Sequence, residues 1–357
     1  MDAIFNLFKI KFKLLEELVL SGCKELQPNS KLNIFINLDC VINKLGSSKS
    51  LEQELQYMSG SKKAYTLISN IINLAAHYRL FFSKNKIYSN VYIYTTFPLN
   101  SNLKNKTIYP EYRYYYISKL INRPSNYLLS ETLKDNFETA KILTEYINGV
   151  HLIESRSVEN SLIPEIINKN MNNGNINFMI TTDPYDYQYV NKGFYILVPK
   201  RDESFIINRD NLWEKLGVEN AGINTQLYSF VLSVLGDKYR SLPKVKGLGL
   251  KTIARAINKA IENKVISKDT SNISLLIPLI KDEYINDVLT NYQCIDLDNQ
   301  MQITPFSSSV AIIKQIVDKF DNAGLQEINN TYFQGNPINI MEITDANKLI
   351  RSNIKVR

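Results

Sequence analysis

The sequence has few of the residues that build disulfide frameworks, histidine metal centres and membrane spans. Its three cysteines, Cys23, Cys40 and Cys294, are far apart and odd in number. They predict neither a disulfide framework nor a zinc site, and they favour a reducing, cytoplasmic compartment. The only histidines are His77 and His151, too few for a histidine-rich metal centre, and they argue against a Ser-His-Asp triad. No apolar run reaches the roughly 18 residues of a membrane helix, so no membrane association is expected.

What is present is typical of a globular chain. Of its 357 residues, 44% are hydrophobic and 22% charged, enough for one large domain or two closely joined ones. The net charge of +7 favours a polyanionic partner, although a basic cytosolic protein without such a partner is the alternative. Residues 1–20 carry lysines inside an apolar stretch and no small-residue cleavage site. They predict an amphipathic helix that covers the core or docks on a partner, rather than a signal peptide.

Short apolar runs alternate with stretches of helical periodicity. The runs that predict strands are 32–38, 91–96, 177–182 and 193–198. Helical patterns cover most of 51–82, 131–147, the region from 208 onward, and 309–320. The alternation predicts an α/β fold with a mostly parallel central sheet and flanking helices, followed by a helical region.

The composition along the chain suggests four parts. We expect an N-terminal helix extension at 1–30, an α/β domain at 31–207, a helical DNA-binding region at 208–300 and a C-terminal extension at 301–357 that packs on the core. Within the α/β domain, residues 101–150 are basic and rich in tyrosine, and they read as an arch-like excursion from the sheet.

One stretch carries the strongest chemical signal: residues 236–257 read GDKYRSLPKVKGLGLKTIARAI. We interpret it as a helix, a tight glycine-containing hairpin and a second helix whose N-terminal amides bind phosphate. The bland alternative is a glycine loop ahead of an amphipathic helix. A hairpin of this kind touches no base and predicts DNA binding without sequence preference. Its expected phosphate-binding residues are Lys244, Lys246, Gly247, Gly249, Lys251, Thr252 and Arg255.

Several acids are expected at the C-terminal ends of the strands, where ligands of such sheets collect. Asp39 follows the first predicted strand, Asp183 follows the third, and Glu154 lies on a helix predicted to begin near residue 152. Carboxylates that converge on one point are typical of a Mg²⁺ site, and two such ions promote phosphodiester cleavage. The alternative is that each acid is a helix cap or a solvated loop residue.

The chain resembles the flap endonucleases and phage-type 5′→3′ exonucleases over roughly residues 32–300. The hairpin stretch is similar to the family pattern G-D-x-x-D-x-I-P-G-V-x-G-I-G-x-K-T-A, and 33–39 is similar to the family's first strand with its metal-binding Asp. Residues 109–113 resemble the basic, aromatic segment after the second strand, and Asp183 with Gln188 resembles S-x-D-x-D-x-x-Q-L. The resemblance implies a PIN-like nuclease domain joined to a helix–three-turn–helix region, Mg²⁺ as the cofactor and Arg113 as a further DNA contact.

The departures from the family pattern fall on its metal-binding acids. No Asp follows the second strand, which ends in two threonines; Arg156 stands in the acidic cluster after Glu154, and Arg240 replaces the second Asp of the hairpin motif. Tyr185 takes the place of another Asp, and Asp186, one residue on, is expected to point elsewhere. The remnant acids are Asp39, Glu154, Asp183 and Asp237.

These substitutions predict that two-metal catalysis is lost, because metal affinity depends on ligand charge and number. The leading interpretation is a nuclease-like protein kept for sequence-independent DNA binding or for assembly, for which a bacteriophage particle is one setting. The first alternative is an active Mg²⁺-dependent nuclease with a reduced site at Asp39, Glu154 and Asp183. The second is a purely structural protein that recognises partners through its N-terminal helix and C-terminal tail.

Overall fold

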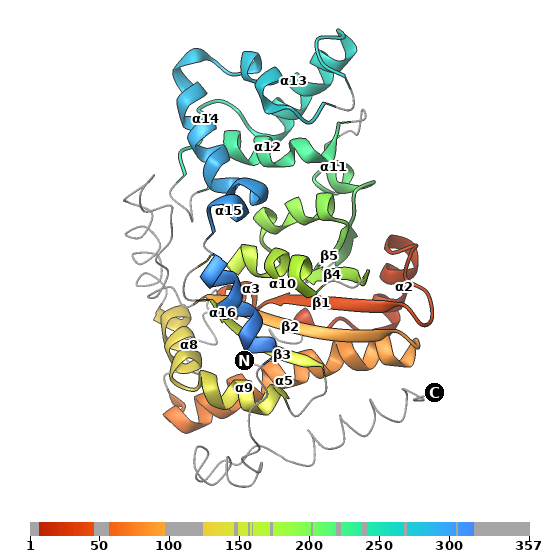
Figure 1. The fold of residues 1–357 in the computed structure, drawn as a ribbon, viewed down its shortest axis with the longest axis vertical. Coiled ribbons are helices and arrows are strands. Elements are labelled where there is room, and N and C mark those ends of the chain that lie inside the picture. The colour runs from red at the N-terminus through yellow and green to blue at the C-terminus, as the bar shows by residue number, and fades with distance from the viewer. Residues whose placement is uncertain are drawn as a thin grey trace.

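The computed structural model places a layer of helices above a sheet that is covered by helices on both faces (Figure 1). It describes residues 7–45, 57–96, 124–145, 149–155, 158, 160–171, 174–200, 203–218, 223–237, 242–267, 270–304 and 306–317. Arg113, Arg156, Arg240, much of the arch-like excursion and the tail beyond 317 lie outside these ranges.

A six-stranded sheet in the order β3-β2-β1-β4-β5-β6 forms the centre of the molecule. The first five strands are parallel and β6 is an antiparallel edge strand. This confirms the predicted mostly parallel α/β fold. The strands are β1 Lys31–Asn37, β2 Tyr88–Thr96, β3 Val150–Ser155, β4 Ile176–Ile180, β5 Phe194–Val198 and β6 Phe205–Ile207.

Two strands were not predicted. Glu154 lies on β3, where it pairs in register with Thr95 of β2, so its placement on a helix is wrong. A six-residue apolar run is too short for periodicity to separate strand from helix, and its pairing with β2 decides the conformation. The three-residue β6 is likewise below the length at which a pattern is visible.

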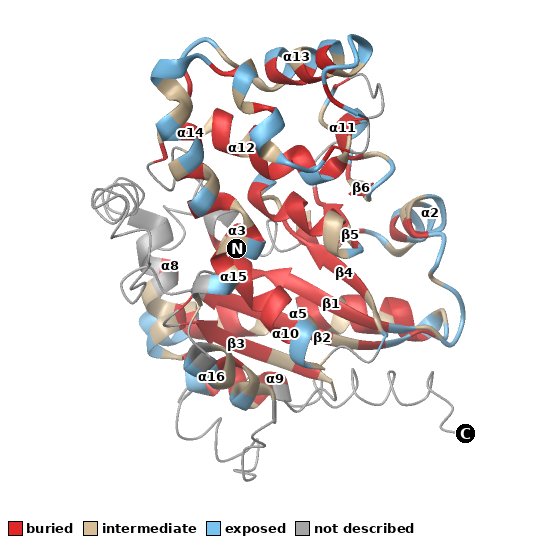
Figure 2. Ribbon diagram, turned by 45° about the horizontal axis from the view of Figure 1, so that its top comes forward, coloured by how far each residue is buried: buried red, intermediate tan, exposed pale blue. Residues whose placement is uncertain are grey.

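The two faces of the sheet bury separate apolar clusters, because successive side chains of a strand point to opposite faces. On β1, Ile34 and Ile36 pack into one cluster and Phe35 into the other. The Phe35 ring lies parallel to Tyr92, with centroids 5.3 Å apart. Figure 2 shows that the strands are buried and that the exposed surface lies on the outer helices.

The helices of the first face include the N-terminal helix. Its α2 begins at Phe12 and buries Leu15 and Val19 in the first cluster, as predicted for a helix that covers the core. The helix predicted at 131–147 is in fact two, α8 and α9. The helices of this part are α2 Phe12–Gly22, α3 Leu38–Leu45, α5 Gly60–Lys84, α8 Pro124–Asp135 and α9 Phe137–Glu145.

The second face carries α10 and the helical region, which the sequence pattern predicted from residue 208. The C-terminal helix α16 returns to the sheet and contacts β3 and α10. The elements of this part are η2 Asn160–Leu162, α10 Ile163–Met171, η3 Pro184–Lys192, α11 Leu212–Lys215, η4 Thr225–Leu227, α12 Tyr228–Leu235, α13 Leu250–Glu262, η5 Ile273–Leu275, η6 Ile277–Leu279, α14 Asp282–Ile295, α15 Leu297–Ile303 and α16 Phe306–Val317. None of the helices in the described ranges is long and apolar enough to cross a membrane.

The two histidines predict a loss of stability on acidification. Burial lowers the pKa of His77 and of His151 to about 4, from about 6.5 in an unfolded chain. The unfolded chain therefore binds more protons in this window, so the free energy of unfolding decreases as the pH falls from 6.5 towards 4. We expect a decrease of about 1–2 kcal/mol per histidine between pH 7 and pH 5, measured by urea unfolding.

A double variant provides the control for this pH dependence. His77→Gln retains a donor for the Ile10 carbonyl, and His151→Phe retains the stacking on Tyr92. The variant should unfold with a flatter pH profile above pH 5. A wild-type slope in the variant would show that other groups cause the loss.

Candidate functional site

The hairpin between α12 and α13 is fixed by backbone geometry and by buried anchors. Helix α12 ends at Gly236, whose φ of +61° lies in the left-handed region. The chain then closes a short antiparallel bridge, in which Asp237 N donates to Leu242 O at 3.1 Å and Leu242 N donates to Asp237 O at 2.8 Å. Leu242 and Val245 are buried in the second apolar cluster. The described part of the hairpin, from residue 242 onward, is therefore anchored in the core.

A buried asparagine that the sequence analysis did not identify holds the hairpin from α14. Asn291 is fully buried, and its side-chain nitrogen donates to the carbonyls of Ser233 and Pro243, each at 2.7 Å. It thereby ties the end of α12 to the returning strand of the hairpin. Its partners lie 58 and 48 residues earlier in the chain, so no local pattern reveals this role.

The far side of the hairpin presents free backbone and positive charge. Gly247 turns through a left-handed φ of +82° and is exposed. Gly249 is the N-cap of α13 with a φ of −113°, so of these two glycines only Gly247 adopts the positive φ that favours glycine. A Cβ at either position would meet no atom within 4 Å, which shows that both face open space.

The first turn of α13 is uncapped by any side chain. The Thr252 amide donates to the Gly249 carbonyl at 2.9 Å, so the amides of Leu250 and Lys251 and the positive end of the helix dipole are the groups offered to an anion. Around them lie exposed side chains that the sequence analysis assigned to phosphate binding: Lys244, Lys246, Lys251, Thr252 and Arg255. The buried face of α13, with Ile253, Ala254 and Ile257, orients this surface outward.

The second candidate site lies at the C-terminal edge of the parallel strands. The last residue of β1 is Asn37, whereas Asp39 lies in the first turn of α3. Asp39 accepts hydrogen bonds from two neutral groups: Thr95 Oγ1 donates to Oδ1 at 2.5 Å, and Asn160 Nδ2 donates to Oδ2 at 2.7 Å. Both carboxylate oxygens are thus satisfied by an amide and a hydroxyl.

Asp186 belongs to the same network, and the expectation that it points elsewhere is wrong. The residue is 1% exposed, and its Oδ2 accepts from Asn37 Nδ2 at 2.9 Å and from Thr181 Oγ1 at 2.6 Å. The reason is the 3₁₀ geometry of η3, in which side chains three residues apart lie on the same side. Asp183, three residues earlier, caps η3 by accepting from Tyr185 N at 2.9 Å.

Tyr94 closes the inner wall of this network. Its side chain is fully buried, and burial together with the carboxylates of Asp186 and Asp39 raises the pKa of Tyr94 well above the usual value. The neutral members Asn37, Asn160 and Thr181, and the adjacent Tyr94, were all missed by the sequence analysis. Such residues reveal their function only through partners distant in the sequence.

The other remnant acids lie apart from this network. Glu154 is buried on β3, two strands from β1, and its backbone exchanges hydrogen bonds with the Gln315 side chain of α16. Asp237 belongs to the hairpin bridge. Within the described ranges, no three His, Cys, Asp or Glu side chains lie close enough to hold a metal ion. The structure therefore does not assemble Asp39, Glu154 and Asp183 into one ligand set.

The chain matches no protein-family model and no curated protein in sequence comparisons. Among solved structures, it is similar to a bacteriophage T5 flap endonuclease determined as a pseudo-enzyme–product complex with DNA and metal ions. This comparison has 15% identity, covers 89% of this chain and 99% of that chain, and has a TM-score of 0.48.

Two further structures are similar. One is the T5 5′-exonuclease with bound zinc, at 16% identity, covering 88% of this chain and 99% of that chain, with a TM-score of 0.49. The other is the catalytic core of Rad2 with a DNA substrate, at 11% identity, covering 92% and 89%, with a TM-score of 0.38. These proteins are of the kind that the sequence motif resembles.

The hairpin geometry predicts different costs for two glycine substitutions. In Gly236→Ala the added Cβ would lie 2.5 Å from the Pro243 carbonyl oxygen on a left-handed residue, so we expect a loss of about 2–3 kcal/mol in stability. Gly249→Ala is the matched control, with a negative φ and open space, and should cost less than about 1 kcal/mol. Guanidinium unfolding measures both. Equal losses would contradict the described hairpin.

The acidic network predicts that one substitution creates a metal requirement. Asn160→Asp places a second carboxylate 2.7 Å from Asp39 Oδ2, and the repulsion should lower stability by about 1–3 kcal/mol at pH 7. Millimolar Mg²⁺ should restore part of that loss, because two adjacent carboxylates bind hard cations. Asn160→Ala removes the donor without adding charge, so Mg²⁺ should have no effect on its thermal unfolding. Equal Mg²⁺ effects on the two variants would contradict the assigned contact.

Proposed function

We propose that this protein binds the phosphate backbone of DNA, without sequence preference, through the hairpin that precedes α13. The observation that carries the proposal is the uncapped N-terminus of α13, which follows the left-handed Gly247 and is surrounded by exposed cations. Backbone amides and the helix dipole recognise phosphate oxygens irrespective of the base. The net charge of +7 acts in the same direction.

The rigidity of the hairpin supports this function. Its amides need to face a phosphate without reordering the loop, since ordering a flexible segment on binding costs affinity. Gly236 and Asn291 hold the part of the hairpin that contains Pro243 against α12. The buried side chain of Val245 anchors the turn in the core. The exposed backbone of the turn is thereby held by residues that do not themselves contact DNA.

We further propose that two-metal cleavage has been lost. The proposal is supported by the donor set at the strand ends: Asn37 ends β1, Asp39 accepts hydrogen bonds from the neutral side chains of Thr95 and Asn160, and no three acids of the described ranges lie close enough to hold a metal ion. Divalent cations select sites by carboxylate charge and oxygen count. The two arginines noted in the sequence motif, Arg156 and Arg240, lie outside the described residues and would lower the affinity further.

One observation favours the alternative of a remodelled hydrolase. Asp186, Asp183 and Asp39 are joined by hydrogen bonds through Thr181, Asn37 and Asn160. A single Mg²⁺ would bind to these three acids only if their side chains moved closer together, since no three acids of the described ranges lie close enough to hold a metal ion. An assembly role through the C-terminal tail, and a location in the cytoplasm or in a viral particle, stay predictions.

The binding proposal predicts a specific change in salt dependence. A Lys246→Ala/Lys251→Ala variant should bind a duplex more weakly. The slope of its log Kd against log salt should be smaller by about 1–2, since each phosphate contact contributes about 0.9 to this slope. Fluorescence anisotropy over a range of KCl concentrations measures this slope. A duplex of permuted sequence should bind equally well.

A matched charge control separates the hairpin from overall basicity. Lys62→Ala/Lys63→Ala removes two lysines of α5 and should leave the slope near the wild-type value. If both double variants change binding equally, or if the wild type binds no duplex at low salt, the hairpin is not the DNA-binding site.

A further inference from the structure

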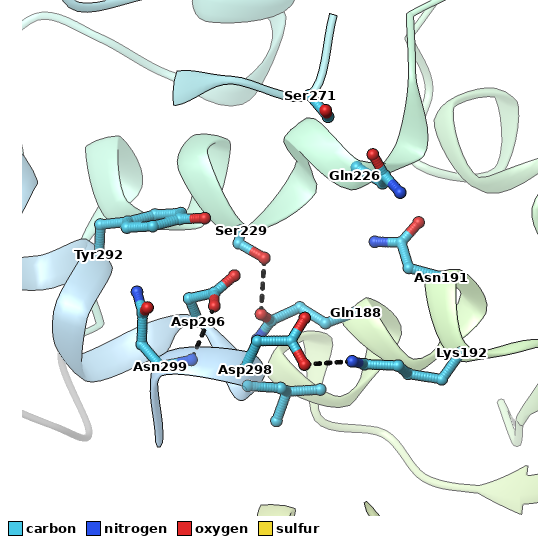
Figure 3. A pocket seen from close by; sticks show the side chains of 11 residues that line it. Gln188, Asn191, Lys192, Gln226, Ser229, Ser271, Tyr292, Asp296, Asp298 and Asn299 are labelled. Carbon is cyan, nitrogen blue, oxygen red and sulfur yellow. Dashed lines mark hydrogen bonds and ion pairs between the residues drawn. The ribbon is translucent and has the colours of Figure 1, made fainter. Parts of the chain in front are cut away.

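A polar cleft of about 380 Å³ lies between η3 and the helical region, away from both the hairpin and the acidic network. Its walls come from η3, the segment that begins α12, Ser271, and the junction of α14 with α15. In Figure 3, Tyr292 and Asp296 lie on one side of the cleft and Gln226 and Asn191 on the other. Its volume suits a small ligand or one side chain of a partner.

Two of the lining amides serve to build the cleft. Gln188 donates to the carbonyls of Tyr185 and Ile295 and accepts from Ser229 Oγ at 2.8 Å. Asn191 exchanges hydrogen bonds with the side chain and backbone of Thr225. Because these contacts join η3 to α12 and α14, the walls are held in place without a ligand.

The charge of the cleft is negative although the protein is basic. Among the described residues, the lining contains the carboxylates of Asp296 and Asp298 and one cation, Lys192. That lysine is already shared, since it pairs with Asp298 and lies 3.7 Å from the buried Glu165 carboxylate. The cleft therefore has an excess of negative charge around its one lysine.

The pKa of Tyr292 is a second indication of this negative charge. Tyr292 lines the cleft beside Asp296, and burial together with the Asp296 and Asp298 carboxylates raises the pKa of its hydroxyl. Burial disfavours any charged group, but the two carboxylates that oppose a phenolate would attract a cation at the same place. The α15 N-cap role of Asp296, which accepts from Asn299 N at 3.0 Å, holds this carboxylate at the wall.

The lining excludes most ligand classes. Phosphates and carboxylates would meet two fixed carboxylates at close range, and an apolar ligand would meet little apolar surface, since Leu297 is the only aliphatic lining residue. A protonated amine matches the charge, and amide and hydroxyl oxygens accept its N–H groups. We propose that this cleft binds an alkylammonium group, carried either by a free aliphatic diamine or by the lysine side chain of a partner.

The proposal does not depend on DNA binding by the hairpin. The cleft lies between the last turn of η3 and α12. The first residues of η3 belong to the acidic network, and the hairpin follows the end of α12. An occupied cleft therefore cross-links the sheet layer to the helical region. Binding should raise the unfolding temperature of the full chain in the absence of DNA.

Isothermal titration of the full-length protein with butane-1,4-diamine at low ionic strength tests the site. We expect saturable binding with one site per chain. Gln226→Lys should weaken it at least tenfold, because it adds a cation at an exposed lining position that the fold tolerates. Asp296→Asn should also weaken binding while keeping the helix cap, since Asn is an equally good N-cap residue.

The control is Asp210→Asn, which removes an exposed carboxylate outside the lining and should leave the affinity unchanged. A parallel titration with Nα-acetyl-lysinamide distinguishes the sources: tighter binding of the diamine assigns a free polyamine, and tighter binding of the lysine analogue assigns a partner's side chain. Absence of saturable binding for both probes, or equal weakening in Asp210→Asn and Gln226→Lys, overturns the proposal.

Discussion

A carboxylate buried at the end of a parallel strand needs a compensating partner, and the choice of partner decides what this fold can do. In this protein the partners of Asp39 and Asp186 include the side chains of Thr95, Asn160, Asn37 and Thr181. These donors are neutral and come from four separate segments of the chain. The sheet edge thus holds its acids in part through neutral donors that the fold itself supplies.

The hairpin meets the opposite requirement. Its backbone must stay exposed and unpaired by side chains, so its stability depends on contacts with the core on the opposite side. Gly236 supplies the left-handed turn, Asn291 bridges the two carbonyls and Val245 anchors the turn in the core. A surface built in this way is rigid where it would meet phosphate. The structure therefore combines an edge whose acids accept from neutral donors of the fold with a hairpin whose backbone is exposed, and this combination underlies the proposal of binding without cleavage.

The sequence predicted the features that depend on local pattern. Apolar runs located β1, β2, β4 and β5 within a few residues, and the glycine-lysine spacing located the hairpin, because strand propensity and left-handed turns are local properties. The sequence did not predict the features that depend on contacts between distant parts of the chain. The six residues of β3 become a strand only beside β2, and Asn37 and Asn160 acquire their roles from partners more than 100 residues away. Asp186 was misplaced because its direction follows from the 3₁₀ turn of η3 and not from its spacing in the motif.

The most direct measurement is the fate of DNA that the protein holds. A 5′-labelled flap and a nicked duplex, incubated with saturating wild-type protein and either Mg²⁺ or Mn²⁺, should be bound in the anisotropy assay and recovered intact on a denaturing gel. Cleavage that requires the metal and disappears in an Asp39→Ala/Asp183→Ala variant would contradict the account. It would show that the acids at the strand ends exchange their neutral partners for a metal ion.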